Sequence, residues 1–203
     1  MSETVAVVDY GAGNLRSAAR ALAAAGAGRV EITSDPAHIA AADRILLPGV
    51  GAFAQCITAL RGAAGIEAAL TRTVLEQRKP FLGICVGMQL LATEGHEHGV
   101  HRGLGWLPGK VTRLTPSDPS LKIPHMGWNS VTAVNASGEP GGDAYFVHSY
   151  RFDPDDAADV RAVSDHGGVF PAIVRRGNIT GVQFHPEKSQ AYGLAFLARW
   201  LQS

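Results

Sequence analysis

A cysteine between two glycines, at the end of an apolar run, is the feature that most constrains the fold of this chain. The segment PFLGICVG spans residues 80–87, and it predicts a buried strand over residues 81–84, a sharp turn at Cys85 and a helix over about residues 86–93. Gly83 and Gly87 fit because larger side chains would crowd so tight a reversal. Such a nucleophile elbow places the thiol at a helix N-terminus, which favours a thiolate, although a buried structural cysteine fits these residues equally well.

A second segment, ITGVQFHPE at residues 179–187, supplies the partners that a reactive thiol needs. It predicts a strand over residues 179–184, followed by His185 and Glu187. Pro186 favours an extended backbone at His185, and in an extended segment residues two apart point the same way. A thiol nucleophile requires a base, and that base requires a group that fixes its tautomer. The hypothesis is therefore a catalytic triad of Cys85, His185 and Glu187.

The first half of the chain alternates between strand and helix patterns. Strands are predicted at residues 5–9, 30–33, 45–47 and 81–84, with helices at residues 15–25, 36–42 and 66–78. This alternation is typical of a parallel sheet covered by helices on both faces. We therefore predict an α/β fold in which residues 1–203 form a single domain.

The pattern changes after about residue 110, where short strands follow one another with little helix between them. They are predicted at residues 110–114, 130–134, 145–150, 160–163, 171–175 and 179–184, and a helix follows at residues 190–201. We expect antiparallel strands here, which either extend the central sheet or form a small second sheet.

Composition excludes several classes of function. Lysine and arginine together number 18, as do aspartate and glutamate, so we expect neither a nucleic-acid footprint nor a membrane contact. The chain has two cysteines, which are no disulfide framework and suit a reduced, cytoplasmic protein. His96, His98 and His101 lack a metal-ligand spacing and indicate a solvated loop. We expect no metal and no cofactor.

Two segments described above, GICVGMQ and GVQFHPEKS, resemble the signatures of the class I (triad) glutamine amidotransferases. Four others narrow the resemblance: DYGAGN at residues 9–14, PGVGAF at 48–53, PHMGWN at 124–129 and FVHSY at 146–150. Together they are similar to the glutaminase subunits of imidazole glycerol phosphate synthase. The resemblance runs from about Val5 to the C-terminal helix, and it implies a flavodoxin-like fold.

The resemblance also implies a division of roles in the site. An oxyanion must be held by preorganised donors, for which the elbow suggests the Val86 N–H and the family suggests the loop Gly49, Val50 and Gly51. Gln89 stands one helical turn beyond Cys85 and can face the same cleft. In the family, Gln89 and the segment His148, Ser149 and Tyr150 would bind glutamine.

A cyclase partner is implied as well, because this chain has no evident second catalytic domain to consume the ammonia. In the family the cyclase is a (β/α)8 barrel that forms a heterodimer with the glutaminase and activates it. Residues 124–129 form an apolar, aromatic loop with Trp128 as an anchor, which is typical of interface cores. The resemblance favours an interface made by Asn14, His125, Met126, Trp128 and Lys188.

Three alternatives stay open from the sequence. A glutaminase of the pyridoxal phosphate, anthranilate or guanylate pathway would usually carry a Pro-Gly-Gly loop where this chain has Pro48-Gly49-Val50-Gly51. A peptidase-like cysteine hydrolase of related architecture would tend to place histidine directly after the cysteine, where Val86 stands. A non-catalytic binding module would not need an intact Cys85, His185 and Glu187.

Overall fold

The computed structural model describes residues 3–134 and 137–203 of the chain. Its main feature is a nine-stranded mixed sheet in the order β2-β1-β3-β4-β13-β12-β11-β8-β9. The first five strands in this order are parallel to one another. They are β2 (Arg29–Thr33), β1 (Thr4–Val8), β3 (Arg44–Gly49), β4 (Phe81–Cys85) and β13 (Ile179–Val182).

The other four strands of the sheet are antiparallel to their neighbours. They are β12 (Val169–Arg176), β11 (Val160–Asp165), β8 (His125–Ala133) and β9 (Gly142–His148). A second sheet has the order β10-β7-β5-β6, and it contains β10 (Tyr150–Pro154), β7 (Gly109–Arg113), β5 (Glu94–Gly95) and β6 (His101–Arg102). The antiparallel strands thus both extend the central sheet and form a small second one.

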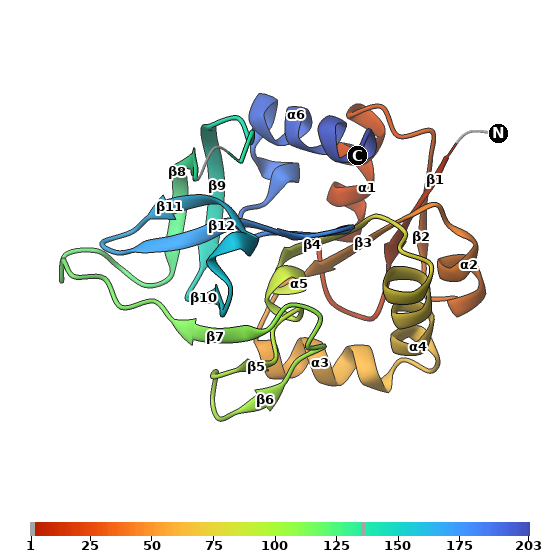
Figure 1. Ribbon diagram of the computed structural model, residues 1–203, viewed down its shortest axis with the longest axis horizontal. Helices are drawn as coiled ribbons and strands as arrows, with labels where there is room; N and C mark the ends of the chain where they lie inside the picture. The colour runs from red at the N-terminus through yellow and green to blue at the C-terminus, as the bar shows by residue number, and fades with distance from the viewer. Residues whose placement is uncertain (1–2, 135–136) are drawn as a thin grey trace.

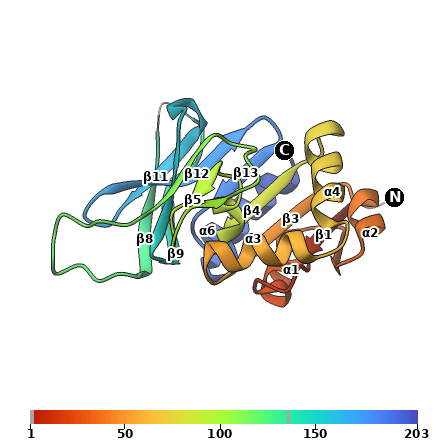
Figure 2. The same cartoon turned by 90° about the horizontal axis from the view of Figure 1, so that it is seen from below.

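Helices cover both faces of the parallel strands (Figure 1). On one face lie α1 (Leu15–Ala24) and α6 (Gln190–Leu201). On the other lie α3 (Phe53–Gly62) and α4 (Ile66–Thr71), and Figure 2 shows the molecule from that side. The short α2 (Pro36–Ala41) begins after Asp35, whose side chain caps the Ala37 N–H. The predicted α/β fold with a mostly parallel centre is confirmed.

Two predicted helices are shorter than their patterns suggested. The helix expected over residues 66–78 ends as α4 at Thr71 and continues as a π-helical turn, Arg72–Glu76. The elbow helix α5 spans only Val86–Gln89. It ends early because the carbonyl groups of Leu90, Leu91 and Ala92 accept hydrogen bonds from N–H groups in residues 104–107 instead of continuing the helix.

Two segments of the antiparallel half also differ from expectation. Residues 124–129 were predicted as a loop, but they belong largely to β8 (His125–Ala133), whose residues 125–131 pair with β9. The strand expected over residues 145–150 is two strands, because β9 pairs in the first sheet whereas β10 pairs with β7 in the second. Ser149 lies between them, and its carbonyl accepts from the Leu114 N–H.

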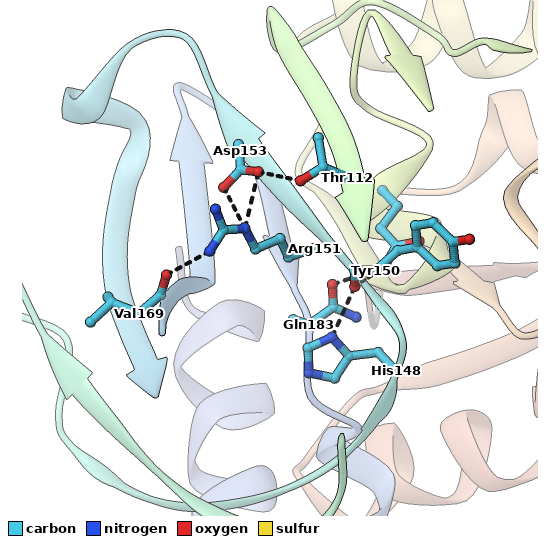
Figure 3. A network of polar contacts seen from close by, with 8 residues as sticks. Thr112, His148, Tyr150, Arg151, Asp153, Val169 and Gln183 are labelled. Carbon is cyan, nitrogen blue, oxygen red and sulfur yellow. Dashed lines mark hydrogen bonds and ion pairs between the residues drawn. The ribbon is translucent and has the colours of Figure 1, made fainter. Parts of the chain in front are cut away.

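Arg151 joins the two sheets (Figure 3). Its Nε lies 3.0 Å from Oδ1 of Asp153, and its Nη1 donates to the Val169 carbonyl of β12 at 3.0 Å. The Thr112 hydroxyl of β7 donates to the same Asp153 carboxylate at 2.8 Å. This network holds β10, and with it the residues around Tyr150, against the end of the main sheet.

Candidate active site

Cys85 occupies a strained turn at the end of β4. Its backbone has φ 55° and ψ −112°, a left-handed conformation that side-chain-bearing residues rarely adopt. Nearby glycines make the turn possible: a Cβ on Gly83 would lie 2.5 Å from the Gly87 carbonyl oxygen, and one on Gly87 would overlap the Leu47 carbonyl. The strand, turn and helix of a nucleophile elbow are therefore present, and their tightness explains both glycines.

His185 reaches the same edge of the sheet from β13, which pairs with β4 so that Val182 lies opposite Ile84. His185 Nδ1 lies 2.8 Å from Glu187 Oε1, and both side chains are buried. Because a carboxylate only accepts, Nδ1 carries the proton and donates it, which leaves Nε2 of a neutral ring as the base. Nε2 has no hydrogen-bond partner among the described residues.

Glu187 reaches His185 by a route that the sequence did not predict. His185 is extended, but Pro186–Lys188 is a turn of 3-10 helix rather than a continuation of the strand. The Ser189 hydroxyl fixes this turn by donating to the His185 carbonyl at 2.7 Å, and its oxygen accepts from the Tyr145 N–H. The two side chains meet because the chain folds back, not because residues two apart share one side of a strand.

Burial disfavours a charged imidazole at His185, but the neighbouring Cys85 and Glu187 outweigh it and raise the pKa of His185 to about 10, so the imidazole holds a proton firmly once Nε2 has received one. A thiolate at Cys85 would therefore face a protonated imidazole, as in other cysteine–histidine pairs.

A cavity of about 260 Å³ joins these groups, enough room for one amino acid. It brings together most of the predicted site residues, although Gly49 and Glu187 are not among those that line it. Those that line it are Val50, Gly51, Cys85, Val86, Gln89, His148, Ser149, Tyr150, His185 and Lys188. The described residues contain no cluster of three side chains suited to a metal, and none of their helices is long and apolar enough to cross a membrane.

The comparisons with known proteins agree with this geometry. The family model "Glutamine amidotransferase class-I" matches residues 6–201. Two proteins named "Imidazole glycerol phosphate synthase subunit HisH" are similar to this chain over 98% of its length: that of Zymomonas mobilis is 56% identical and matched over 96% of its own length, and that of Rhodospirillum rubrum is 52% identical and matched over 98%. The chain belongs to the class I glutamine amidotransferases.

Solved structures of the same fold are more distant in sequence. A glutamine amidotransferase crystal structure superposes with a TM-score of 0.76 at 21% identity, covering 98% of this chain and 99% of its own. The structure of PurLQS from Thermotoga maritima gives a TM-score of 0.72 at 22% identity, covering 100% of this chain and 97% of its own. The amidotransferase fold therefore extends over nearly the whole chain.

The amidotransferase pocket contains an amide network that sequence reasoning missed. Gln89 Nε2 donates to the Tyr150 carbonyl and to Gln183 Oε1, both at 3.0 Å. Gln183 in turn donates to the Cys85 sulfur at 3.6 Å. Both protons of the Gln89 amide are used, so its carbonyl oxygen remains to accept from a substrate. Gln183 could have been found, because a glutamine inside an apolar strand must have buried partners.

Glu97 is the second residue that the sequence did not reveal. The loop of residues 96–100 is mostly exposed, as expected, but Glu97 turns inward and lines the cavity. Its Oε2 accepts from the Phe53 N–H at the start of α3, at 2.7 Å. Its neighbours in sequence gave no signal, because they are glycines and histidines of a polar loop.

His148, which lines the cavity, forms a buried pair with His125. His148 Nδ1 donates to the Tyr150 carbonyl at 2.9 Å (Figure 3), and its Nε2 lies 3.0 Å from His125 Nδ1. Burial lowers the pKa of His148 to about 3 and that of His125 to about 4, and His166, stacked on His125, adds to both effects. Both imidazoles are therefore neutral at pH 7, and the Tyr150 carbonyl fixes their tautomers.

The predicted interface residues separate into two groups. Met126 and Trp128 are 63% and 50% exposed on β8, and Lys188 and Asn14 are also exposed. Asn14 stands at the N-cap position of α1 but makes no capping hydrogen bond, so its side chain is free. His125, by contrast, is 4% exposed and stacks on Phe146. Its position supports the pocket wall and offers no surface to a partner.

Proposed function

We propose that this chain is the glutaminase subunit of an imidazole glycerol phosphate synthase, and that Cys85, His185 and Glu187 catalyse glutamine hydrolysis. The observation that carries the proposal is a strained, buried cysteine sharing a cavity with an imidazole whose Nε2 is unpartnered and whose Nδ1 is held by a carboxylate. The full-length relatedness to proteins named as HisH subunits supports the biosynthetic assignment.

The first half-reaction forms a thioester. His185 accepts the Cys85 proton through Nε2, and the thiolate attacks the carboxamide carbon of glutamine. The carbon–nitrogen bond then breaks, and the leaving nitrogen takes the proton from His185 and departs as ammonia. Glu187 keeps the imidazole oriented and stabilises its charged form. Gln183 donates to the sulfur and holds it in the pocket.

The second half-reaction releases glutamate. His185 removes a proton from a water molecule, which attacks the thioester carbon, and the carbon–sulfur bond breaks as the thiol is regenerated. Both tetrahedral intermediates carry an oxyanion, for which Val86 and the loop of Gly49, Val50 and Gly51 would supply backbone N–H donors. Gln89 Oε1 and the Glu97 carboxylate are suited to bind the α-ammonium group of glutamine. Ser149 and Tyr150 also line the cavity and would contact other parts of the substrate.

A cyclase partner follows from the chemistry of ammonia. At neutral pH free ammonia is mostly protonated and is then no nucleophile, so a closed path to the acceptor is an advantage. We propose that Asn14, Met126, Trp128 and Lys188 dock a (β/α)8-barrel cyclase as a heterodimer. Lys188 lies beside the active-site pocket and also over the Tyr145 ring at 5.6 Å, close to Trp128.

We also propose that residues 1–203 act as one amidotransferase domain in the cytoplasm. Both cysteines, Cys56 and Cys85, are free thiols, as a reducing compartment requires.

Co-purification with the cyclase, followed by a glutamine-dependent cyclisation assay, tests the function. We expect a stable complex, poor glutamine hydrolysis by this chain alone and a large rise in rate when the cyclase and its nucleotide ligand are added. Equal rates with and without the cyclase would contradict the subunit assignment.

A further inference from the structure

Two side chains outside the triad hold the loop of Gly49, Val50 and Gly51 from below. The Tyr10 hydroxyl, just beyond the end of β1, donates to the Pro48 carbonyl at 2.8 Å. The Cys56 thiol, in the first turn of α3, donates to the Val50 carbonyl at 3.3 Å. Among the described residues, these are the side-chain hydrogen bonds made to residues 48–51.

Both donors are buried, and both keep their protons. Burial raises the pKa of Tyr10 and that of Cys56. The adjacent Cys56 raises the pKa of Tyr10 further, whereas the hydrogen bond from Tyr10 offsets only part of the rise at Cys56. Cys56 is therefore a neutral thiol, suited to donating a hydrogen bond and unsuited to acting as a nucleophile. Cys56 is also part of the buried hydrophobic core.

The two contacts fix the peptide groups on either side of the Gly49–Val50 link. In a planar trans peptide, the carbonyl and the following N–H point in opposite directions. A Val50 carbonyl directed down to Cys56 therefore turns the Gly51 N–H away from α3. In the same way, a Pro48 carbonyl directed to Tyr10 turns the Gly49 N–H away from Tyr10. The Pro48 ring packs closely against Gly13, because a Cβ added to Gly13 would lie 2.8 Å from the Pro48 Cγ.

Pro48 and Gly49 are also held by their pairing with β4, as the last residues of β3, whereas Val50 and Gly51 lie beyond the paired strand. The Val50 side chain is exposed, and Gly51 has a positive φ of 102° that places little steric limit on a glycine. Without the Cys56 thiol, the Val50–Gly51 peptide would lose the one side-chain hydrogen bond that holds it among the described residues, and without the Tyr10 hydroxyl the Pro48–Gly49 peptide would depend on its strand pairing alone. An oxyanion site works only when its donors are already in place, because reorientation during the reaction loses the benefit.

We propose that Tyr10 and Cys56 are positioning residues that preset the oxyanion loop for glutamine hydrolysis. The proposal rests on the proposed function, since it assigns a role within that reaction. It adds that a thiol remote from the chemistry controls the rate of hydrolysis through one backbone carbonyl.

The experiment compares Cys56→Ala, Cys56→Ser and Tyr10→Phe in the complex with the cyclase. We expect Cys56→Ala and Tyr10→Phe to lower kcat for glutamine by about tenfold with little change in KM, because the loop acts on the transition state and not on substrate binding. Cys56→Ser should recover part of the rate, since its hydroxyl also donates. Ile57→Val, the buried neighbour on α3, is the matched control and should behave like the wild type.

Two further readouts separate this role from general damage to the fold. Alkylation of Cys85 by iodoacetamide needs no oxyanion site, so its rate should stay unchanged in both loss variants. Hydrogen–deuterium exchange over residues 48–53 should rise in Cys56→Ala and Tyr10→Phe but not in Ile57→Val, and it can be measured on the chain whether or not it is active.

An unchanged kcat and unchanged exchange in Cys56→Ala would overturn the proposal, as would a fall in alkylation that matches the fall in kcat. A wild-type complex without glutaminase activity would instead contradict the proposed function. In that case the exchange data alone would still decide whether the two residues hold the loop.

Discussion

The parallel and antiparallel halves of the large sheet are built differently and hold different parts of the site. The parallel strands β3, β4 and β13 are buried along their whole length, whereas β8 and β9 alternate between buried and exposed residues. The carboxyl ends of β3, β4 and β13 carry the oxyanion loop, Cys85 and His185. The antiparallel half supplies the pocket wall at His148 and the exposed face at Trp128, and β10 of the second sheet adds Tyr150 to that wall.

This difference shows how the fold divides its tasks. Parallel neighbours end at one edge of a sheet, so residues a hundred positions apart are delivered to one place by buried, rigid strands. Antiparallel strands with one solvated face leave side chains free to recognise a partner. We therefore expect changes in the parallel half to affect chemistry and folding, and changes in the antiparallel half to affect pH tolerance and partner binding.

The largest expected effect is on activity, from a substitution at the end of β4. Cys85→Ala should lower glutamine hydrolysis by about 10⁴-fold or more, because no covalent intermediate can form. Circular dichroism and thermal unfolding should show an intact fold. Residual activity within tenfold of the wild type would mean that the parallel half does not hold the nucleophile.

The next effect is on stability, and it tests the tightness of the elbow. Gly87→Ala would push a Cβ into the Leu47 carbonyl, and we expect the free energy of unfolding to fall by about 3 kcal/mol or more. Gly62→Ala, at the end of α3, meets no atom within 4 Å and is the matched control. Chemical denaturation of both variants measures the difference in their free energies of unfolding. Equal values would show that the elbow tolerates a Cβ at residue 87.

Acidification tests the buried histidines of the antiparallel half. His148 and His125 have pKa values of about 3 and about 4, below the unfolded value of about 6.5. The unfolded chain therefore binds more protons between pH 4 and 6.5, so stability falls as the pH falls through this window. We expect each histidine to lower the free energy of unfolding by about 2 kcal/mol at pH 5 relative to pH 7.5.

His125→Gln provides the comparison for that acid effect, because glutamine can still donate to His148 but does not titrate. Urea unfolding at both pH values should show a smaller loss of stability in the variant than in the wild type. The same loss in both proteins would place the acid-sensitive groups elsewhere.

The smallest expected effect concerns the exposed face of β8. Trp128→Ala should weaken binding of the cyclase by about 1–2 kcal/mol, as expected for an aromatic anchor, and should leave the stability of the isolated chain nearly unchanged. Ile32→Ala removes an exposed apolar side chain from β2, at the opposite edge of the sheet. Calorimetric titration that gave the same affinity for both variants would remove β8 from the interface.

The two halves also differed in what could be predicted from sequence. Buried strands with glycine-flanked turns have few alternatives, so the elbow at Cys85 and the strand before His185 were readable from local patterns. The segment at residues 124–129 could not be read in this way, because its mixture of apolar, polar and glycine residues fits a partly exposed strand as well as a loop. Its pairing with β9 is a tertiary contact that no local pattern contains.

The same limit applies within the pocket. Cys85, His185, Glu187 and Gln89 stand in recognisable motifs, whereas Glu97 enters the pocket from a polar loop whose path depends on its hydrogen bond to the Phe53 N–H. Gln183 was missed although it could have been found as a polar residue inside an apolar strand, and its bond to the Cys85 sulfur depends on the register of β13 against β4. The sequence therefore predicted which residues act where they stand in a motif, but it did not predict which way side chains outside the motifs point.

The most direct test of the central claim is to find which thiol reacts with a glutamine-like electrophile. The chain, in complex with the cyclase, is treated with a chloroketone analogue of glutamine and then digested for mass spectrometry, with the His185→Asn variant in parallel. The account predicts one adduct, at Cys85, formed much more slowly in the variant. An adduct at Cys56, or no adduct at Cys85 in the complex, would contradict it.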